Sequence, residues 1–220
     1  MRSTTFKNRV LALSGMGISL AMLIAFARPG AGFSAAAGSP AGNPQTIVMN
    51  TVAEATQVLS DHRMPTETRR QKLVEIVSSR FDFSGMARSS LGYQWRRLTP
   101  AQQNQFVQLF TAFIEDVYLN KLDGYQGQKI EYLPSPPLGP TQAEVRTLVL
   151  QPNGQEPVRV NYMLKPIDGQ WRVYDVTVDN LSITANYRDQ FNHVINTQGF
   201  DALIQKMQAK RDQLVASMNK

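Results

Sequence analysis

The sequence contains no cysteine and only two histidines, and these absences remove whole classes of site. Without cysteine there is no disulfide, thiolate ligand or thiol nucleophile, so the fold depends on its hydrophobic core. His62 and His193 stand far apart, without the close spacing of a histidine-based zinc site. We therefore predict no metal site and no disulfide framework.

Motifs for nucleophilic or phosphate chemistry are also missing. A serine hydrolase of the α/β class needs a pattern such as G-x-S-x-G. Ser182 lies between leucine and isoleucine, and Ser84 precedes a glycine but lacks the rest of the pattern. No glycine-rich run follows a strand pattern, so no phosphate-binding loop is expected. The chain is predicted to have no catalytic residues and no cofactor, and not to be an enzyme.

Acidic residues are absent from the first 37 positions, and the residue types there follow one another as in an export signal. The basic residues Arg2, Lys7 and Arg9 precede an uncharged, largely apolar run over residues 10–27, and small residues follow. This order predicts a cleaved signal peptide over residues 1–37. The alternative is an uncleaved membrane anchor, because the apolar run is long enough to span a bilayer.

The leader also accounts for most of the positive charge. Four of the 23 basic residues and none of the 17 acidic ones lie within residues 1–37, so the remaining chain has a net charge of +2 rather than +6. So small a charge, without a run of lysine or arginine, argues against nucleic acid as a partner. Residues 38–45, rich in glycine and proline, are predicted to be a linker, and residues 46–220 a single domain.

Helical periodicity dominates the first half of this domain. Apolar residues at three- and four-residue spacing predict helices over residues 47–60, 66–79 and 99–122, and residues 81–91 are predicted to form a short turn and a helix. Thr99, Pro100 and Gln102 form a capping box with a first-turn proline, which marks the start of the longest helix. One face of that helix is a stripe, either an ordinary core face or the wall of a ligand site, made of Phe106, Leu109, Phe110, Phe113 and Val117.

From Lys129 onward the apolar period changes to two, as in strands. Four strands are predicted, over residues 129–133, 143–151, 155–165 and 170–179, and short turns between the last three make them antiparallel. On the last strand Trp171 and Val173 are out of phase with Val176 and Val178. Either both faces of the sheet are covered or a bulge switches the register.

Two further helical patterns, over residues 182–197 and 201–218, close the chain. Helices, then antiparallel strands, then helices is the order of an α+β fold. We predict one curved, four-stranded antiparallel sheet packed with helices, without an internal repeat or a second core.

One group of residues near the last strand could carry chemistry, namely Tyr174, Asp175, Asn186, Tyr187 and Arg188. A tyrosine and an aspartate in an apolar pocket can transfer protons, as in ketosteroid isomerase. An isomerase-type enzyme acting on a small apolar substrate is therefore an alternative function. In the other interpretation Asp175 is structural and accepts hydrogen bonds from Arg188 or from a helix N-terminus.

Three segments together resemble the MlaC-type, or toluene-tolerance, family of periplasmic phospholipid-binding proteins from Gram-negative bacteria. They are FDFSGMARSSLGYQW at 81–95, TPAQQNQFVQLFTAFIEDVYLNKLDGY at 99–125 and WRVYDVTVDNLSITANYRDQF at 171–191. The resemblance extends from about Thr46 to Leu214. The sequence departs from the family pattern just before Leu181, where the resemblance implies a turn that contains glycine. Asn180 can adopt the same left-handed conformation.

The resemblance implies an NTF2-like arrangement of sheet and helices that encloses an apolar pocket for phospholipid acyl chains. It implies a periplasmic carrier that exchanges phospholipid with the substrate-binding subunit of an inner-membrane ABC transporter complex and with an outer-membrane lipoprotein–porin complex. Such exchange maintains the lipid asymmetry of the outer membrane. Branches of the family are linked to other lipids such as hopanoids, so a different lipid is an alternative cargo.

The expected lipid-binding site combines the helix stripe with positions on the sheet. Acyl tails are expected to insert between two sets of side chains, and the headgroup is expected to stay at the mouth of the pocket. The helix set is Phe106, Phe110, Phe113 and Val117. The sheet set is Val149, Tyr162, Leu164 and Val173.

Overall fold

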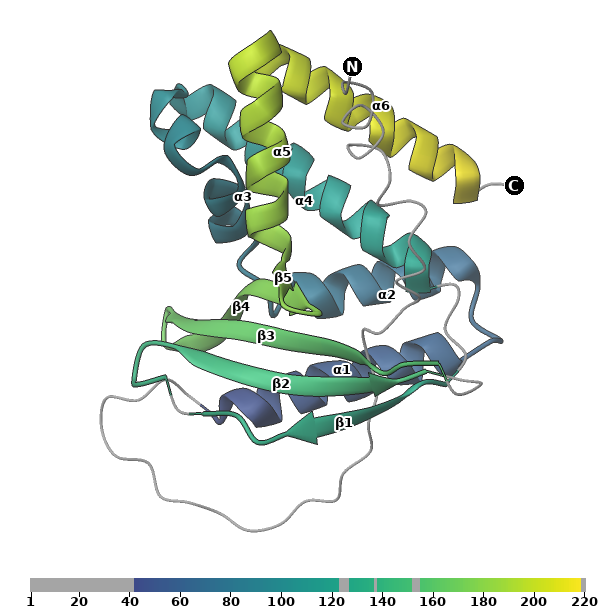
Figure 1. The fold of residues 1–220 in the computed structure, drawn as a ribbon. Coiled ribbons are helices and arrows are strands. Elements are labelled where there is room, and N and C mark those ends of the chain that lie inside the picture. The colour runs from purple at the N-terminus through teal and green to yellow at the C-terminus, as the bar shows by residue number, and fades with distance from the viewer. Residues whose placement is uncertain (1–41, 123–126, 137, 152–154, 219–220) are drawn as a thin grey trace, which may run out of the picture.

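The computed structural model describes residues 42–122, 127–136, 138–151 and 155–218 (Figure 1). The predicted signal peptide and most of the predicted linker lie outside these residues. The helices are α1 (Pro44–Ser60), α2 (Thr66–Ser78), α3 (Phe83–Leu91), the 3-10 helix η2 (Gly92–Arg97), α4 (Pro100–Leu122), α5 (Ile183–Gln198) and α6 (Phe200–Met218).

The strands form one antiparallel sheet in the order β1-β2-β3-β4-β5. They are β1 (Lys129–Leu133), β2 (Ala143–Leu150), β3 (Val158–Ile167), β4 (Gln170–Val178) and β5 (Leu181–Ser182). The α+β prediction is confirmed. The predicted strand number was wrong by one, because β5 has only two residues, too few to show a period in the sequence.

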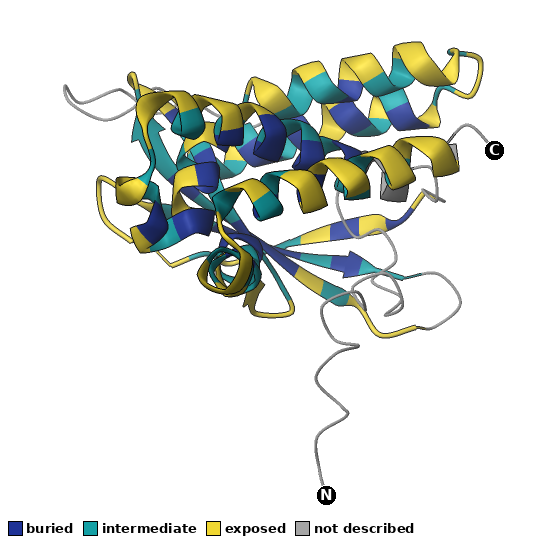
Figure 2. Ribbon diagram, turned by 90° about the horizontal axis from the view of Figure 1, so that it is seen from above, coloured by how far each residue is buried: buried dark blue, intermediate teal, exposed yellow. Residues whose placement is uncertain are grey.

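Helices cover the sheet unequally. Figure 1 shows α1 running along the sheet with α2 beside it, while α3, α4, α5 and α6 gather in the other half of the molecule. Buried residues lie on the inward faces of these helices, and along β2 they alternate with half-buried ones (Figure 2). This is the two-layer packing of an α+β domain.

Side chains cap the starts of α1 and α3, and α1 begins earlier than expected. The Asn43 side chain accepts a hydrogen bond from the Gln45 N–H at 2.8 Å, so α1 starts at Pro44, inside the predicted linker. Asp82 accepts from the Gly85 N–H at 2.8 Å, which sets the start of α3 at Phe83, within the segment predicted to be a short turn and a helix.

The predicted start of α4 is confirmed. The Gln102 N–H donates to the Thr99 hydroxyl at 3.3 Å, and the Thr99 N–H donates back to the Gln102 side chain at 3.0 Å. This reciprocal pair is a capping box that satisfies two backbone donors at the helix start.

A bulge in β4 explains the mixed apolar pattern of that strand. The pairing of β3 with β4 shifts between Met163 and Leu164, which leaves Tyr174 as the extra residue. The shift returns Val173 to the face occupied by Val176, and both are buried. Of the two explanations that the sequence allowed, the bulge is the one that the structure contains.

The turn from β4 to β5 also agrees with expectation. Asn180 has a φ of 67° and Asp179 a φ of 47°, so both central residues are left-handed. Two such residues form the hairpin turn whose twist matches antiparallel strands. Asparagine and aspartate tolerate this conformation better than other residues with a side chain, so the turn forms without the glycine of the family pattern.

Candidate functional site

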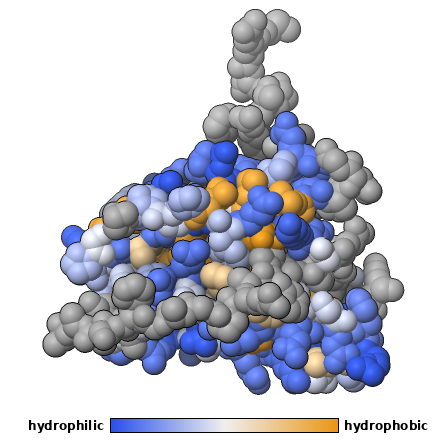
Figure 3. All heavy atoms as spheres, turned by 90° about the horizontal axis from the view of Figure 1, so that it is seen from below, coloured by the Kyte–Doolittle hydropathy of each residue, from blue (hydrophilic) through white to orange (hydrophobic). Residues whose placement is uncertain are grey.

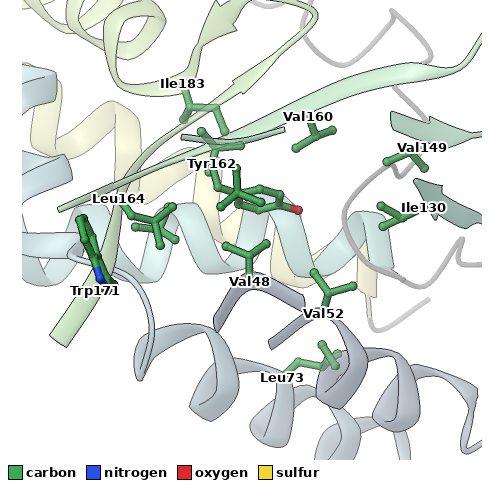
Figure 4. Close-up of a cluster of buried hydrophobic side chains, with 14 of the residues drawn as sticks. Val48, Val52, Leu73, Ile130, Val149, Val160, Tyr162, Leu164, Trp171 and Ile183 are labelled. Atoms are coloured by element: carbon green, nitrogen blue, oxygen red, sulfur yellow. The ribbon is translucent and has the colours of Figure 1, made fainter. Parts of the chain in front are cut away.

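One side of the sheet faces α1 across a layer of apolar side chains (Figure 4). We call this side the inner face. It carries Ile130, Tyr132, Val145, Thr147, Val149, Val160, Tyr162, Leu164, Val173 and Val176. Val48 and Val52 of α1 lie opposite, and both are buried. The layer is the first of two buried apolar clusters.

The sheet residues predicted to bind lipid come together on this face. Val149 and Leu164 are fully buried, Val173 is 3% exposed and Tyr162 is 4% exposed. All four belong to the same cluster. The alternation of apolar residues along β2 and β3 was therefore a sound guide to the inner face.

The predicted helix residues lie in the second cluster instead. Phe106 and Phe110 are fully buried, and Phe113 is nearly so. Their rings pack against α5: Phe106 meets Phe191 edge to face with centroids 5.8 Å apart, and Phe113 meets Tyr187 at 5.6 Å. The stripe thus holds α4 against α5 and α6, and the structure does not bring it directly against the four sheet residues.

Three partly buried rings join the two clusters. Phe81, Tyr118 and Tyr187 each pack against both of them. Phe81 is fixed there because its neighbours pair with the edge of β4: the Val173 N–H donates to the Arg80 carbonyl at 2.9 Å, and the Asp82 N–H donates to the Val173 carbonyl at 2.8 Å. Burial raises the pKa of Tyr118 and of Tyr187 far above the ordinary value, so both hydroxyls are neutral.

Hydroxyl groups interrupt the apolar inner face on three adjacent strands. Tyr132 on β1 lies opposite Thr147 on β2, and Tyr162 on β3 lies one pair further along, opposite Val145. Sequence reasoning missed Tyr132. The signal was available, because Tyr132 is two residues after Ile130 on the same strand and so shares its face.

Within the polar group near the last strand, Asp175 forms structural hydrogen bonds. The Asp175 carboxylate accepts hydrogen bonds from the Val176 N–H at 2.9 Å, the Thr184 N–H at 3.1 Å and the Ser182 hydroxyl at 2.5 Å. It therefore binds the N-terminus of α5, as one of the two interpretations predicted. Arg188 packs over Gly92 instead. A Cβ atom added at Gly92 would lie only 3.0 Å from the Cδ of Arg188.

In the part of the chain that the structure describes, no group of three or more metal-ligating side chains occurs, and His62 and His193 are exposed. No helix there is long and apolar enough to cross a membrane. An open pocket of about 390 Å³ has walls that include Gln94, Arg97 and Asn196, and it contains none of the predicted lipid-binding residues.

Fold and site together define an α+β protein whose antiparallel sheet presents an apolar inner face to a covering helix. On the face of the molecule nearest β1 and α1, apolar residues also gather at the surface among hydrophilic ones (Figure 3). The chain belongs to the MlaC protein family, whose pattern matches residues 49–209, so the predicted family is confirmed.

The chain is similar to two relatives with related names. It is 29% identical over 126 residues to the intermembrane phospholipid transport system binding protein MlaC of Haemophilus influenzae, a match that covers 56% of this chain and 59% of that protein. It thus spans less than two thirds of the Haemophilus protein. It is 28% identical over 169 residues to the toluene tolerance protein ttg2D of Pseudomonas putida, covering 73% and 77% of the two chains.

A solved structure is similar over most of the fold. The phospholipid-binding protein from Ralstonia solanacearum, determined in complex with a phospholipid, superposes with a TM-score of 0.70 at 25% sequence identity. The superposition covers 79% of this chain and 99% of that chain.

Proposed function

We propose that this protein binds a phospholipid by its acyl chains and carries it between the inner and outer membranes of a Gram-negative envelope. The observation that carries the proposal is the likeness to almost the entire length of the Ralstonia protein, which was determined with a phospholipid bound. The apolar inner face of the sheet, with four of the predicted residues buried on it, supports the same conclusion.

Burial of acyl chains supplies enough free energy for such a carrier. Each methylene removed from water contributes roughly 0.8 kcal/mol, so one tail of about 14 methylenes gains up to about 11 kcal/mol. Ordering the lipid and the protein offsets part of this gain. Spontaneous loss of the lipid into water is then very slow, so transfer has to take place while the carrier is docked on a membrane complex.

We place the acyl chains on the inner face of the sheet. Val149, Tyr162, Leu164 and Val173 line this site in the proposal. The helix set Phe106, Phe110, Phe113 and Val117 supports it from behind, because Phe81, Tyr118 and Tyr187 pack against both clusters. Opening the layer between α1 and the sheet would admit a tail without breaking the aromatic packing of α4 on α5.

The compartment and the partners belong to the same proposal. Removal of residues 1–37 would release the carrier into the periplasm. There it would receive or deliver lipid at an inner-membrane ABC transporter complex, through the substrate-binding subunit, and at an outer-membrane lipoprotein–porin complex. The names of the Haemophilus and Pseudomonas relatives, an intermembrane transport protein and a solvent-tolerance protein, are consistent with such a route.

Reloading from vesicles tests the proposal. Delipidated protein is incubated with vesicles of phosphatidylethanolamine and phosphatidylglycerol, separated from them by size exclusion, and extracted for lipid quantification. We expect phospholipid to travel with the protein. Protein that stays free of phospholipid in this assay would refute the proposal. A parallel incubation with vesicles that also contain a hopanoid identifies the alternative cargo.

A further inference from the structure

Two tyrosine hydroxyls on the inner face have no hydrogen-bond partner. The hydroxyl oxygens of Tyr132 and Tyr162 are buried, and neither forms a hydrogen bond with any part of the chain that the structure describes. Tyr162 as a whole is 4% exposed. Buried hydroxyls are normally bonded, so two orphans on one face need an explanation.

The hydroxyl of Thr147 donates to neither tyrosine. Thr147 lies between the two tyrosines on the middle strand and is fully buried, and its own hydroxyl donates to the Val160 carbonyl at 2.6 Å. The hydroxyl proton of Thr147 is therefore already engaged in a hydrogen bond within the sheet. Each tyrosine keeps a hydroxyl donor that no acceptor in the described part of the chain satisfies.

The hydrocarbon side chains that the Tyr162 hydroxyl faces offer no acceptor. Figure 4 shows the Tyr162 ring lying over the inner face, with its hydroxyl directed toward the side of Val149 and Ile130 and across from Val52 of α1. All three of these side chains are buried hydrocarbons. A phenylalanine ring would fill the same space without leaving a polar atom unpaired, so packing alone does not account for the hydroxyl.

The hydroxyls are also electrically neutral. Burial raises the pKa of Tyr132 to about 12. Burial also raises the pKa of Tyr162 far above the ordinary value, and the neighbouring Tyr132 adds to that rise. The inner-face residues are all uncharged, and a phosphate brought among them would lose its hydration without gaining a counter-charge. A neutral oxygen acceptor attached to an apolar chain suits this place better than a charged headgroup.

We propose that Tyr132 and Tyr162 form a polar subsite within the acyl-chain site and donate hydrogen bonds to an ester carbonyl oxygen of the bound lipid. The inference rests on the proposed phospholipid binding and adds the part of the lipid that is recognised. It makes the protein selective for ester-linked over ether-linked chains, because an ether-linked lipid has no carbonyl at that point.

Matched lipids test the subsite. Delipidated protein is loaded from vesicles that contain equal amounts of dipalmitoyl phosphatidylglycerol and its di-O-hexadecyl ether analogue, and the bound lipids are counted by mass spectrometry. One net hydrogen bond corresponds to a preference of about fivefold, so wild type should favour the ester by about this factor. The double variant Tyr132→Phe/Tyr162→Phe should load both lipids about equally. Its empty form should unfold at the same or a higher temperature, since two unpaired hydroxyls are gone.

A tyrosine elsewhere provides the control. The Tyr93 hydroxyl donates to the Asn196 side chain at 3.0 Å and is far from the inner face in the fold, so Tyr93→Phe should keep the ester preference. Equal loading of both lipids by wild type, as expected if the hydroxyls merely hold a water molecule, would overturn the subsite and leave phospholipid binding intact. So would an ester preference that survives in the double variant. Wild type that loads neither lipid would refute the proposed function itself.

Discussion

The carboxylate of Asp175 on β4 accepts a hydrogen bond from the backbone N–H of Thr184, 3.1 Å away, in the first turn of α5. The same carboxylate accepts from Ser182, whose hydroxyl oxygen in turn accepts from the Ala185 N–H at 3.0 Å. One side chain thus joins the last long strand to the helix that packs on α3, α4 and α6. It satisfies donors that the start of a helix otherwise leaves unpaired.

Replacing this carboxylate should affect stability more than lipid binding. Asp175→Ala leaves the partly buried N–H of Thr184 without an acceptor, and we expect a loss of about 2–3 kcal/mol in the free energy of unfolding. Asp175→Asn keeps one acceptor oxygen and should lose less. Urea denaturation measures both changes. If Asp175→Asn abolished turnover of a small apolar substrate while the fold and lipid loading were unchanged, the enzymatic alternative would stand.

Removing a buried carboxylate on α4 should also lower the free energy of unfolding, because this carboxylate joins neighbouring helices. Asp116 is 4% exposed and pairs with Arg70 of α2 and with Arg211 of α6, whose Nε lies 2.8 Å from its Oδ2. Asp116→Ala leaves two half-buried cations together, so we expect a loss of about 2–4 kcal/mol in unfolding free energy. As a matched control, Arg63→Ala removes an exposed ion pair and should change stability by less than about 1 kcal/mol. Equal effects of the two changes would contradict this account.

The neighbouring Glu115 should make stability depend on pH. Burial raises the pKa of its carboxyl above 4.5; the hydrogen bond from Ser78 opposes this, the Asp116 charge adds to it, and Arg211 and Arg70 oppose it. The folded protein therefore holds this proton more tightly than the unfolded chain does, and this contribution is lost as the pH rises through the raised pKa.

Glu115→Gln isolates that contribution. The variant is neutral at every pH, so its stability relative to wild type should increase as the pH rises above 4.5 and then level off. Thermal unfolding of both proteins between about pH 4 and 7 measures the difference. A stability difference that stays constant over this range would show that the carboxyl titrates alike in the folded and unfolded chains.

Bulky residues on the inner face should block the acyl-chain site. Val149→Trp and Leu164→Trp each fill the layer between the sheet and α1, and we expect phospholipid loading to fall severalfold. Overpacking itself costs typically 1–3 kcal/mol, so a matched control is needed. Leu203→Trp overpacks the second cluster at a position that is 2% exposed, and it should destabilise the protein without reducing loading. Unchanged loading in both sheet variants would mean that the tails lie elsewhere.

The sequence predicted the local elements of this fold well, because their signals are short-range. The Thr99–Gln102 capping box, the alternation along β3 and the out-of-phase residues of β4 each reflect contacts within a few positions of the chain. The structure shows a helix start, an inner face and a bulge where these signals predicted them. Local periodicity indicates that a face is buried.

Periodicity does not show what covers that face. The stripe of α4 was expected to oppose the sheet, whereas Phe106 and Phe110 meet Phe191, a residue distant in sequence. Tyr132 was overlooked because β1 has only five residues, so Ile130 is the one other residue of that strand on its face and the alternation is weaker than along β2 and β3. The unpaired state of its hydroxyl is a property of the packed sheet and has no signature in the sequence.

The lipid content of the purified protein tests the central claim most directly. The protein is produced with its leader in a Gram-negative host, isolated from the periplasmic fraction without detergent, and its organic extract is analysed by mass spectrometry. The account predicts phospholipid in an amount comparable to the protein, and much less in Val149→Trp. An extract without phospholipid, from folded protein recovered in that fraction, would contradict it.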